Sequence, residues 1–354
     1  MAISLSNSFD VAIVGSGVLG SALSAEARAQ GLHVVCIGPD SPSEPLVAGR
    51  WFRLNTWTRP DPHPLLSRHL RRGERFLPAD ALVRAATQVL HDSGAERVPA
   101  RVSEIKAAPR GVELRAGRSL IRANAAVLAL GWGALKVELT KPEPLRRALK
   151  RGEHAFDFST ALQRLATRAL QHPTLAVVGG GPSALSFLEA CVGLSPQPRL
   201  GLTKSQRVLW FDGKTPPEAP PGVKRMFEVR YAPLFARLKR TTQVQRISAR
   251  VCAAHRRAGR WALVDAAGKT HEADGVVWCG GLSAPLELLG ATHRPLVHDG
   301  VKLALQRFTR GRAVPVFQVG SALDQLGLAD WDTGPYAEWF EKGRRLLRLL
   351  GGTG

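Results

Sequence analysis

Two glycine-rich segments carry the residues of this chain that could bind phosphate. In the pattern G-x-G-x-x-G/A, the first glycine permits a tight turn, the second lets a pyrophosphate approach the backbone, and the third small residue lets a helix pack closely on a strand. The free N–H groups at the start of that helix then face the phosphates. The pattern occurs twice, as Gly15, Ser16, Gly17, Val18, Leu19, Gly20 and as Gly179, Gly180, Gly181, Pro182, Ser183, Ala184.

Each glycine-rich segment is flanked by the elements that a dinucleotide site needs. A short apolar run precedes it, an Ala- or Leu-rich stretch with helical spacing follows, and a second apolar run comes next. The predicted strand, helix and strand span 11–14, 21–30 and 34–37 in the first unit, and 174–178, 185–194 and 207–211 in the second. Two such βαβ units predict an α/β chain with two Rossmann-like, doubly wound domains.

The residue after the second strand usually supplies a carboxylate for the ribose hydroxyls of the nucleotide. In the second unit this residue is Asp212. In the first unit it is Gly38, and Asp40 follows two residues later. We therefore expect Asp40 to replace the usual carboxylate, or the backbone alone to hold the ribose.

Three later strands also end in glycine. The predicted strands over 125–130, 275–279 and 314–319 lead into Gly131, Gly280-Gly281 and Gly320-Ser321. The first two follow their glycine motifs by roughly 100 residues, which suits late strands that return beside the first strand of a doubly wound domain. A helix is predicted over 334–350.

This layout resembles the flavoproteins with two dinucleotide-binding domains, which include the flavin-containing monooxygenases, the lysine and ornithine N-hydroxylases and the thioredoxin-reductase-like enzymes. The resemblance covers nearly the whole chain. It implies FAD at the first motif and NAD(P)H at the second, with the NAD(P)H-binding domain (151–282) inserted into a discontinuous FAD-binding domain (1–150 and 283–354). The helix over 334–350 would then direct its N-terminus at the flavin ring.

The resemblance also assigns residues to the two sites. Ala129-Leu130-Gly131 would close the FAD site and Gly280-Gly281 the NAD(P)H site. In the FAD site Arg101 and Val102 would lie by the adenine, and Gly320-Ser321 would meet the ribitol and pyrophosphate, with Ser321 in place of the usual aspartate. In the second unit Asp212 favours NADH, whereas Lys204, Arg207 and Lys214 could meet a 2′-phosphate. The resemblance favours NADPH, with NADH as the alternative.

Composition and charge restrict the classes of function. The 354 residues are 44% hydrophobic with a net charge of +20, which suits a globular protein of about two domains rather than a disordered chain. We attribute the charge mainly to scattered arginines; a small anionic substrate, an acidic electron-transfer protein or nucleic acid are the partners it could attract, nucleic acid being the least favoured. The four cysteines form no C-x-x-C pair, which argues against disulfide reduction and metal binding and for a cytoplasmic protein. No membrane-spanning segment or secretory leader is expected.

The chemistry at the flavin is the least determined part. The segment after the second strand runs along the flavin in the resembling enzymes, and here it contains Arg53, Asn55 and Thr56. Asn55 and Thr56 would hydrogen-bond the flavin or a flavin peroxide, and Arg53 or Arg59 would hold an anionic substrate. We expect a monooxygenase acting on a small amine, thiol or aromatic metabolite. An NAD(P)H reductase for ferredoxin, flavodoxin or a quinone is the alternative enzyme, and a nucleic-acid-binding protein on a flavoprotein scaffold is the alternative of another class.

Overall fold

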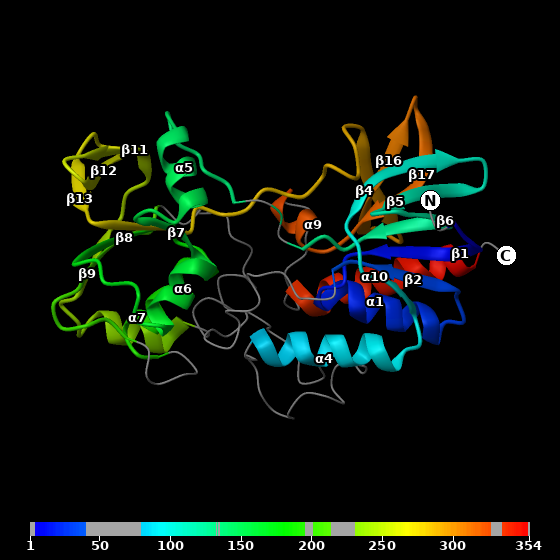
Figure 1. The fold of residues 1–354 in the computed structure, drawn as a ribbon, viewed down its shortest axis with the longest axis horizontal. Helices are drawn as coiled ribbons and strands as arrows, with labels where there is room; N and C mark the ends of the chain where they lie inside the picture. The colour runs from blue at the N-terminus through cyan, green and yellow to red at the C-terminus, as the bar shows by residue number, and fades with distance from the viewer. Residues whose placement is uncertain are drawn as a thin grey trace.

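The computed structural model describes residues 4–39, 79–131, 133, 135–194, 201–213, 231–326 and 335–352. These residues form two lobes, each built on its own mainly parallel sheet (Figure 1). The first sheet takes strands from both ends of the chain, and the second sheet takes strands from the middle.

The first sheet has a parallel centre in the order β17-β6-β1-β2-β3. A meander adds β4 and β5 antiparallel to β6, and a hairpin extends the sheet beyond β17. On one face α1 packs against α4 and α10. The bounds are β1 Ser4–Val14, α1 Val18–Ala29, β2 Val34–Ile37, α4 Ala79–Asp92, β3 Glu96–Val98, β4 Val102–Ala108, β5 Gly111–Ala116, β6 Ser119–Leu128, β15 His293–His298, β16 Val301–Thr309, β17 Arg312–Gln318, α9 Ser321–Gln325 and α10 Pro335–Gly351.

The second sheet is parallel throughout, in the order β10-β9-β8-β14-β7. Helices α6 and α7 lie on one face, and the antiparallel sheet of β11, β12 and β13 lies with α5 on the other (Figure 1). The bounds are α5 Glu143–Arg151, β7 Ala155–Asp157, α6 Phe158–Ala166, β8 Thr174–Val178, α7 Pro182–Cys191, β9 Arg207–Phe211, β10 Val244–Ile247, β11 Val251–Arg257, β12 Arg260–Asp265, β13 Thr270–Ala273 and β14 Gly275–Trp278.

The predicted fold class is confirmed, and the central strands explain why. Val11 and Ile13 pack under α1, whereas Ala12 and Val14 pack on the opposite face beside the meander. A strand that is buried on both faces reads as a continuous apolar run. The predicted bounds of β2, β8 and β9 agree with the structure, but α1 begins at Val18 instead of Ser21 because Gly17 already occupies the N-cap position.

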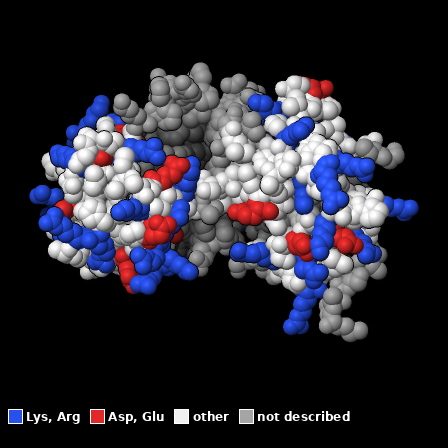
Figure 2. Space-filling view, turned by 90° about the horizontal axis from the view of Figure 1, so that it is seen from above, with Lys and Arg blue, Asp and Glu red and all other residues white. Residues whose placement is uncertain are grey.

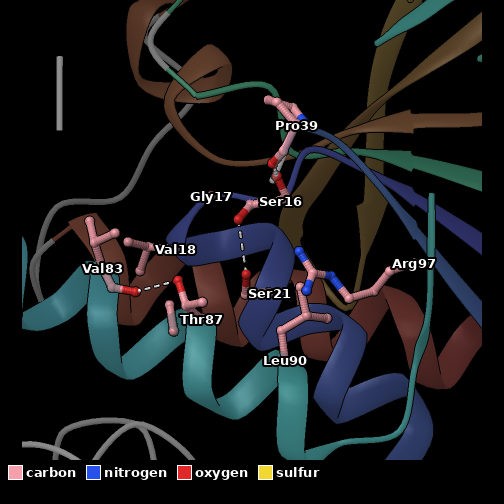
Figure 3. A pocket seen from close by; sticks show the side chains of 10 residues that line it. Ser16, Gly17, Val18, Ser21, Pro39, Val83, Thr87, Leu90 and Arg97 are labelled. Carbon is pink, nitrogen blue, oxygen red and sulfur yellow. Dashed lines mark hydrogen bonds between the residues drawn. The ribbon is translucent and has the colours of Figure 1, made fainter. Parts of the chain in front are cut away.

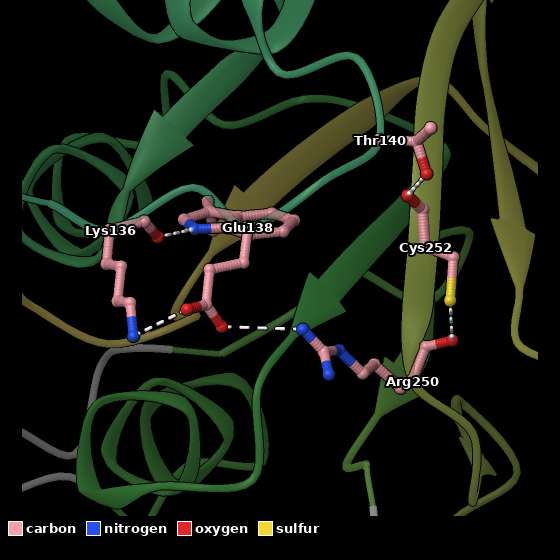
Figure 4. Close-up of polar contacts among 6 residues, drawn as sticks. Lys136, Glu138, Thr140, Arg250 and Cys252 are labelled. Atoms are coloured by element: carbon pink, nitrogen blue, oxygen red, sulfur yellow. Dashed lines mark hydrogen bonds and ion pairs between the residues drawn. The ribbon is translucent and has the colours of Figure 1, made fainter.

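Two crossing segments connect the lobes, and they pair with each other. Leu135 forms an isolated antiparallel bridge with Leu282, and the Lys136 N–H donates to the Gly281 carbonyl at 3.0 Å. Figure 4 shows the first segment bound to the second lobe: Glu138 pairs with Lys136 and Arg250, and Thr140 donates to the Cys252 carbonyl. The Lys136 ammonium donates to Glu138 and holds the pKa of that carboxyl below its ordinary value.

The predicted domain boundaries at 150/151 and 282/283 stay predictions. Helix α5 ends at Arg151 and packs against β7 and β11, with Leu145 and Ala148 in the core beneath them. The chain therefore contacts the second lobe before residue 151. The second crossing returns at Leu282, beside the predicted boundary.

Charged side chains are spread over the face seen in Figure 2. Lys and Arg occur on both lobes, with Asp and Glu between them. Many of the arginines have carboxylate partners, such as Arg260 with Glu272 and Asp274. No helix among the described residues is long and apolar enough to cross a membrane.

A pair of stacked histidines at the amino edge of the second sheet predicts a pH dependence of stability. His154 and His172 stack with their ring centroids 5.0 Å apart, and burial, followed by the charges of His154 and Arg164, lowers the pKa of His172 below its ordinary 6.5. The unfolded chain then binds more protons below pH 6.5, so the free energy of unfolding should fall as pH decreases through 6.5 towards the lowered pKa. Denaturant unfolding between pH 5 and 8 measures this slope. His172→Gln should flatten it, and an unchanged slope would contradict the assignment.

Candidate dinucleotide sites

The two glycine turns are built by the same hydrogen bonds. The Gly15 N–H donates to the Ile37 carbonyl at 2.7 Å, and the Gly179 N–H donates to the Phe211 carbonyl at 2.8 Å. Each turn also closes on its late strand: Ala129 donates to Val14 at 2.8 Å, and Cys279 donates to Val178 at 2.7 Å. The repeated sequence motif therefore has the same hydrogen bonds to the second strand and to the late strand in both units.

The first glycine of each turn is required by its backbone conformation. Gly15 has φ +118° and Gly179 has φ +134°, which L side chains rarely adopt. A Cβ atom would lie 2.3 Å from the Ala129 carbonyl oxygen in the first turn and 2.3 Å from the Cys279 carbonyl oxygen in the second. Each turn therefore lies too close to the end of its late strand for any side chain at the first glycine.

The second glycine of each motif faces open space. Gly17 is the N-cap of α1 and Gly181 the N-cap of α7, and a Cβ at either would have no heavy atom within 4 Å. No side chain caps either helix among the described residues. The first amide groups of both helices are thus presented to whatever approaches these glycines, which is the arrangement that binds a pyrophosphate.

A pocket lies at the N-terminus of α1, between α1, α4 and β3 (Figure 3). Ser16, Gly17, Val18 and Ser21 line it from the turn and α1, and α4 and the Arg97 side chain on β3 face them. Arg97 is opposite Cys36 in the β2–β3 register. Arg97 was not predicted from the sequence, because only the β2–β3 pairing brings it near the glycine turn.

The absence of a carboxylate after β2 has a steric reason. A Cβ at Gly38 would lie 2.5 Å from Ser16 Oγ and 2.6 Å from the Ser16 nitrogen. The Ser16 hydroxyl in turn donates to the Pro39 carbonyl at 2.7 Å. Ser16 thus occupies the place from which an acidic residue would reach the ribose.

The second unit reverses this arrangement. The residue equivalent to Ser16 is Gly180, and the residue equivalent to Gly38 is Asp212. A Cβ added at Gly180 would lie 2.3 Å from the Asp212 carbonyl oxygen. Asp212 is 7% exposed and pairs with Arg246 on β10 through Oδ2. Trp210 on β9 donates its indole N–H to the Gly179 carbonyl at 2.9 Å, and the Arg246 guanidinium lies over its ring. Arg246 and Trp210 were missed, since their proximity follows from the β9–β10 register.

Two of the three cations predicted to meet a 2′-phosphate lie at the wrong edge of the second sheet. Arg207 is the first residue of β9, and Lys204 precedes it, so both belong to the amino edge of the second sheet. The glycine turn lies at the carboxyl edge, about 15 Å away along a five-residue strand. The suggestion that Lys204 and Arg207 meet the nucleotide is therefore wrong, and Lys214 lies outside the described residues.

The segments predicted to close the two sites follow β6, β14 and β17, and their roles at a nucleotide stay predictions. Gly131, Gly281 and Gly320 all have positive φ, and a Cβ on Gly320 would lie 2.7 Å from a methyl carbon of Leu19. Ser321 is buried at the start of α9, and its hydroxyl donates to the Gly131 carbonyl. Ser321 therefore joins the two closing segments of the first site, and its hydroxyl hydrogen is already used.

Removing this hydroxyl should loosen the closing turn. Ser321→Ala leaves the Gly131 carbonyl to solvent and should cost about 1 kcal/mol of unfolding free energy, the net value of an ordinary hydrogen bond. The expected result is a lower melting temperature and faster loss of FAD from the loaded protein. Ser103→Ala, which removes an exposed hydroxyl on β4, is the control and should change neither. Equal FAD retention in both variants would contradict a role for Ser321.

The remaining predicted residues are placed as follows. Val102 is the buried first residue of β4, Arg101 is exposed before it, and neither lines the pocket of Figure 3. Their assignment to the adenine stays a prediction. Asp40 and the segment with Arg53, Asn55 and Thr56 lie outside the described residues, so the predicted catalytic groups are not located.

The four cysteines are all free, and three of them are buried. Burial raises the pKa of the Cys36, Cys191 and Cys279 thiols above the ordinary value of 9.0. A thiol with a raised pKa is a poor nucleophile at neutral pH. Among the described residues, no group of three or more His, Cys, Asp or Glu side chains is placed to hold a metal ion.

Solved structures with a similar fold include flavin monooxygenases and thioredoxin reductases. The chain is similar to the cadaverine monooxygenase of desferrioxamine biosynthesis from Erwinia amylovora, bound to FAD (15% identity, TM-score 0.68, covering 98% of this chain and 95% of that chain). It is also similar to a flavin-containing monooxygenase from Stenotrophomonas maltophilia (17%, 0.62, 98% and 99%) and to T. acidophilum thioredoxin reductase (14%, 0.62, 98% and 98%). At these identities the similarity is one of fold, and the expected resemblance is confirmed at that level. No protein-family model and no curated protein sequence matches the chain.

Proposed function

We propose that this protein is an FAD-containing oxidoreductase that takes electrons from a reduced pyridine nucleotide. FAD binds at the Gly15–Gly20 turn, and the pyridine nucleotide binds at the Gly179–Ala184 turn. The observation that carries the proposal is the duplication of the turn, with matching hydrogen bonds at 2.7–2.8 Å and an uncapped helix start in each copy. Bound FAD would supply the redox chemistry by accepting a hydride and passing electrons on.

The described residues fit both groups. The amides at the start of α1 and α7 would each bind a pyrophosphate, and the open space at Gly17 and Gly181 would admit it. Arg97 would add a positive charge beside the first site, and Asp212 would accept hydroxyl hydrogens at the second. Ser321 would hold the closing turn of the first site rather than contact the ribitol as an aspartate does.

Within this class we favour a monooxygenase that acts on a small amine, thiol or aromatic metabolite. A disulfide reductase would need a reactive thiol pair, and three of the four free cysteines are buried with raised pKa values. The chain is similar in fold both to monooxygenases and to a thioredoxin reductase, so the choice rests on the cysteines. The predicted inserted-domain arrangement, with FAD residues from both ends of the chain, is part of the proposal.

Oxygen and peroxide measurements separate the enzyme classes. FAD-loaded protein is given NADH or NADPH in air, and oxygen uptake and hydrogen peroxide release are followed while small amines, thiols and aromatic compounds are added. A monooxygenase predicts that one class of compound accelerates oxygen uptake and lowers peroxide release, with an oxygenated product. Electron transfer to ferredoxin, flavodoxin or a quinone without oxygen would instead establish the reductase alternative, in which the +20 charge would attract an acidic partner.

A further inference from the structure

The amino edge of the second sheet gathers positive charge that the proposed function does not use. Helices α5, α6 and the helix over 231–238 each end shortly before a strand of this sheet, so their last turns lie at this edge. The β11–β12 turn joins them, because Arg260 pairs with Asp274 directly before β14. The exposed or half-buried cations at the edge are Lys150, Arg151, Arg164, Arg168, Lys204, Arg207, Arg237, Lys239, Arg240, Arg256, Arg257 and Arg260.

Carboxylates do not balance this charge. The exposed or half-buried carboxylates described at the edge are Glu153, Glu272 and Asp274, and each already pairs with an arginine. Glu153 lies 3.9 Å from Arg151, and Glu272 and Asp274 lie 2.7 and 3.1 Å from Arg260. The cations that pair with no described carboxylate include Lys150, Arg168, Lys204, Arg207, Arg237, Lys239, Arg240, Arg256 and Arg257. A surface with this excess of one sign attracts an anionic partner.

The surface lies at the end of the second lobe that faces away from the first lobe. β14 leads from this edge to the crossing segment at Leu282, so the amino ends of the parallel strands point outwards (Figure 1). Lys and Arg predominate over Asp and Glu at this outer end, on the left of Figure 2. The length of β9, about 15 Å, separates the edge from the second glycine turn, and the first lobe is farther still. An electron-transfer protein docked here would be too far from a flavin in the first lobe to accept electrons directly.

The composition of the surface indicates which anion fits. Arginine outnumbers lysine among its cations, and a guanidinium can bind two phosphate oxygens at once. The large apolar side chains exposed in the described part of the chain, Val297 and Leu326, both belong to the first lobe. The edge therefore offers no described apolar anchor for the centre of a protein interface or for insertion into a membrane. Its five strands span roughly 20 Å, which matches several phosphates spaced about 3.4 Å apart along a nucleic acid strand.

We infer that the amino edge of the second sheet binds the phosphate backbone of nucleic acid without reading its sequence. These arginines are scattered along the chain, which made nucleic acid the least favoured partner, and strand pairing brings them onto one surface. The inference goes beyond the proposed function, because the two glycine turns lie away from this edge. Nucleic acid and the pyridine nucleotide should therefore bind independently.

The test measures the fluorescence anisotropy of a labelled duplex DNA of about 20 base pairs, and of its single strand, titrated with the FAD-loaded protein. We expect a Kd of about 10 μM or tighter at about 50 mM salt, and a loss of at least about tenfold in affinity at about 200 mM. Changing Lys204, Arg207 and Arg240 together to glutamine should weaken binding at least about tenfold at the lower salt. Each lost phosphate contact should also reduce the salt slope by about one.

The matched control removes the same charge from the first lobe. Arg110, Arg118 and Arg312 are exposed on its antiparallel strands and turns, and changing them together to glutamine should leave DNA binding as in the unaltered protein. Equal binding by the two triple variants would show that net charge rather than this surface attracts DNA, and would overturn the inference. If the first triple variant fails to fold, its three single substitutions are measured instead, and each should reduce the salt slope by about one.

The unaltered protein supplies the remaining decisions. A Kd weaker than about 100 μM at about 50 mM salt, or tighter binding per unit charge to polyglutamate or to phosphatidylserine vesicles than to DNA, would overturn the inference. Reduction of the flavin by NADH or NADPH is measured separately, with and without DNA. A protein that binds DNA through this edge but whose flavin neither nucleotide reduces would keep the inference and refute the proposed function, and the converse result would do the reverse.

Discussion

Gly17→Val should abolish retention of FAD while leaving the fold intact, and Gly181→Val should abolish reduction by the pyridine nucleotide while FAD stays bound. Both glycines have negative φ in the extended region, and a Cβ at either position meets no heavy atom within 4 Å. Valine therefore fits the backbone but fills the space above the helix amides. Losing one or two charge-assisted hydrogen bonds to a pyrophosphate, at about 1.5–3 kcal/mol each, weakens binding by about 10-fold to about 10⁴-fold.

The two variants are each other's controls. FAD content is measured from the visible spectrum after gel filtration, and nucleotide-dependent bleaching of the flavin is measured without oxygen on protein that has been reloaded with FAD. Unchanged melting temperatures, apart from the contribution of bound FAD, show that the fold survives. If both variants keep FAD, or if Gly181→Val loses it as readily as Gly17→Val, the assignment of one dinucleotide to each turn is wrong.

Gly20→Ala should have the largest effect on folding of any single methyl group added to the first turn. Its Cβ would lie 1.7 Å from the Gly15 carbonyl oxygen, which is backbone that cannot move without opening the turn. We expect a loss of more than about 3 kcal/mol, the scale of severe core overpacking, and little soluble protein. The measurement is the yield of soluble protein and its denaturant unfolding curve.

The second turn provides the control for this substitution. Ala184 holds the position equivalent to Gly20 and is fully buried, so α7 already accommodates a methyl group there. Ala184→Gly should cost only about 1 kcal/mol, the difference in helix propensity. A stable Gly20→Ala protein, or an equal loss in both variants, would show that the two helices do not differ in their approach to the strand.

The glycine motifs were predictable because local chemistry alone specifies them. Val11–Val14 and Thr174–Val178 read as buried strands, and a turn that needs positive φ can hardly be anything but glycine, as at Gly15 and Gly179. The burial of the strands on both faces also predicted parallel sheets. The two-domain fold follows from finding this unit twice.

The other residues near the two turns could not be predicted, because strand pairing and contacts between residues distant in sequence determine their places. Arg97 reaches the first pocket only because β3 pairs with β2, and Arg246 reaches Asp212 only because β10 pairs with β9. From the sequence, the missing carboxylate at Gly38 had no explanation. In the structure the Ser16 side chain occupies the space beside Gly38 and donates a hydrogen bond to the Pro39 carbonyl. Lys204 and Arg207 looked close to the nucleotide because they are near Asp212 in sequence, whereas a strand separates them from it in space.

The two units differ in which residue beside the glycine turn carries a side chain, which would let the proposed sites hold different dinucleotides. In the first unit the middle residue of the turn is Ser16 and the strand ends in Gly38, and in the second the middle residue is Gly180 and the strand ends in Asp212. In each unit only one of the two residues carries a side chain. The first site is therefore left with a cation, Arg97, near its helix, and the second with an anion.

The most direct test of the central claim is an anaerobic titration of the FAD-loaded protein with NADH and, in parallel, with NADPH, while the visible flavin band is recorded. We expect that the protein retains FAD and that roughly one equivalent of nucleotide bleaches the band completely, since one hydride carries the two electrons that the flavin accepts. The Gly181→Val protein should keep its band under the same conditions. Failure of the protein to hold FAD, or a flavin that neither nucleotide reduces, would contradict the proposal that the two turns bind an electron donor and its acceptor.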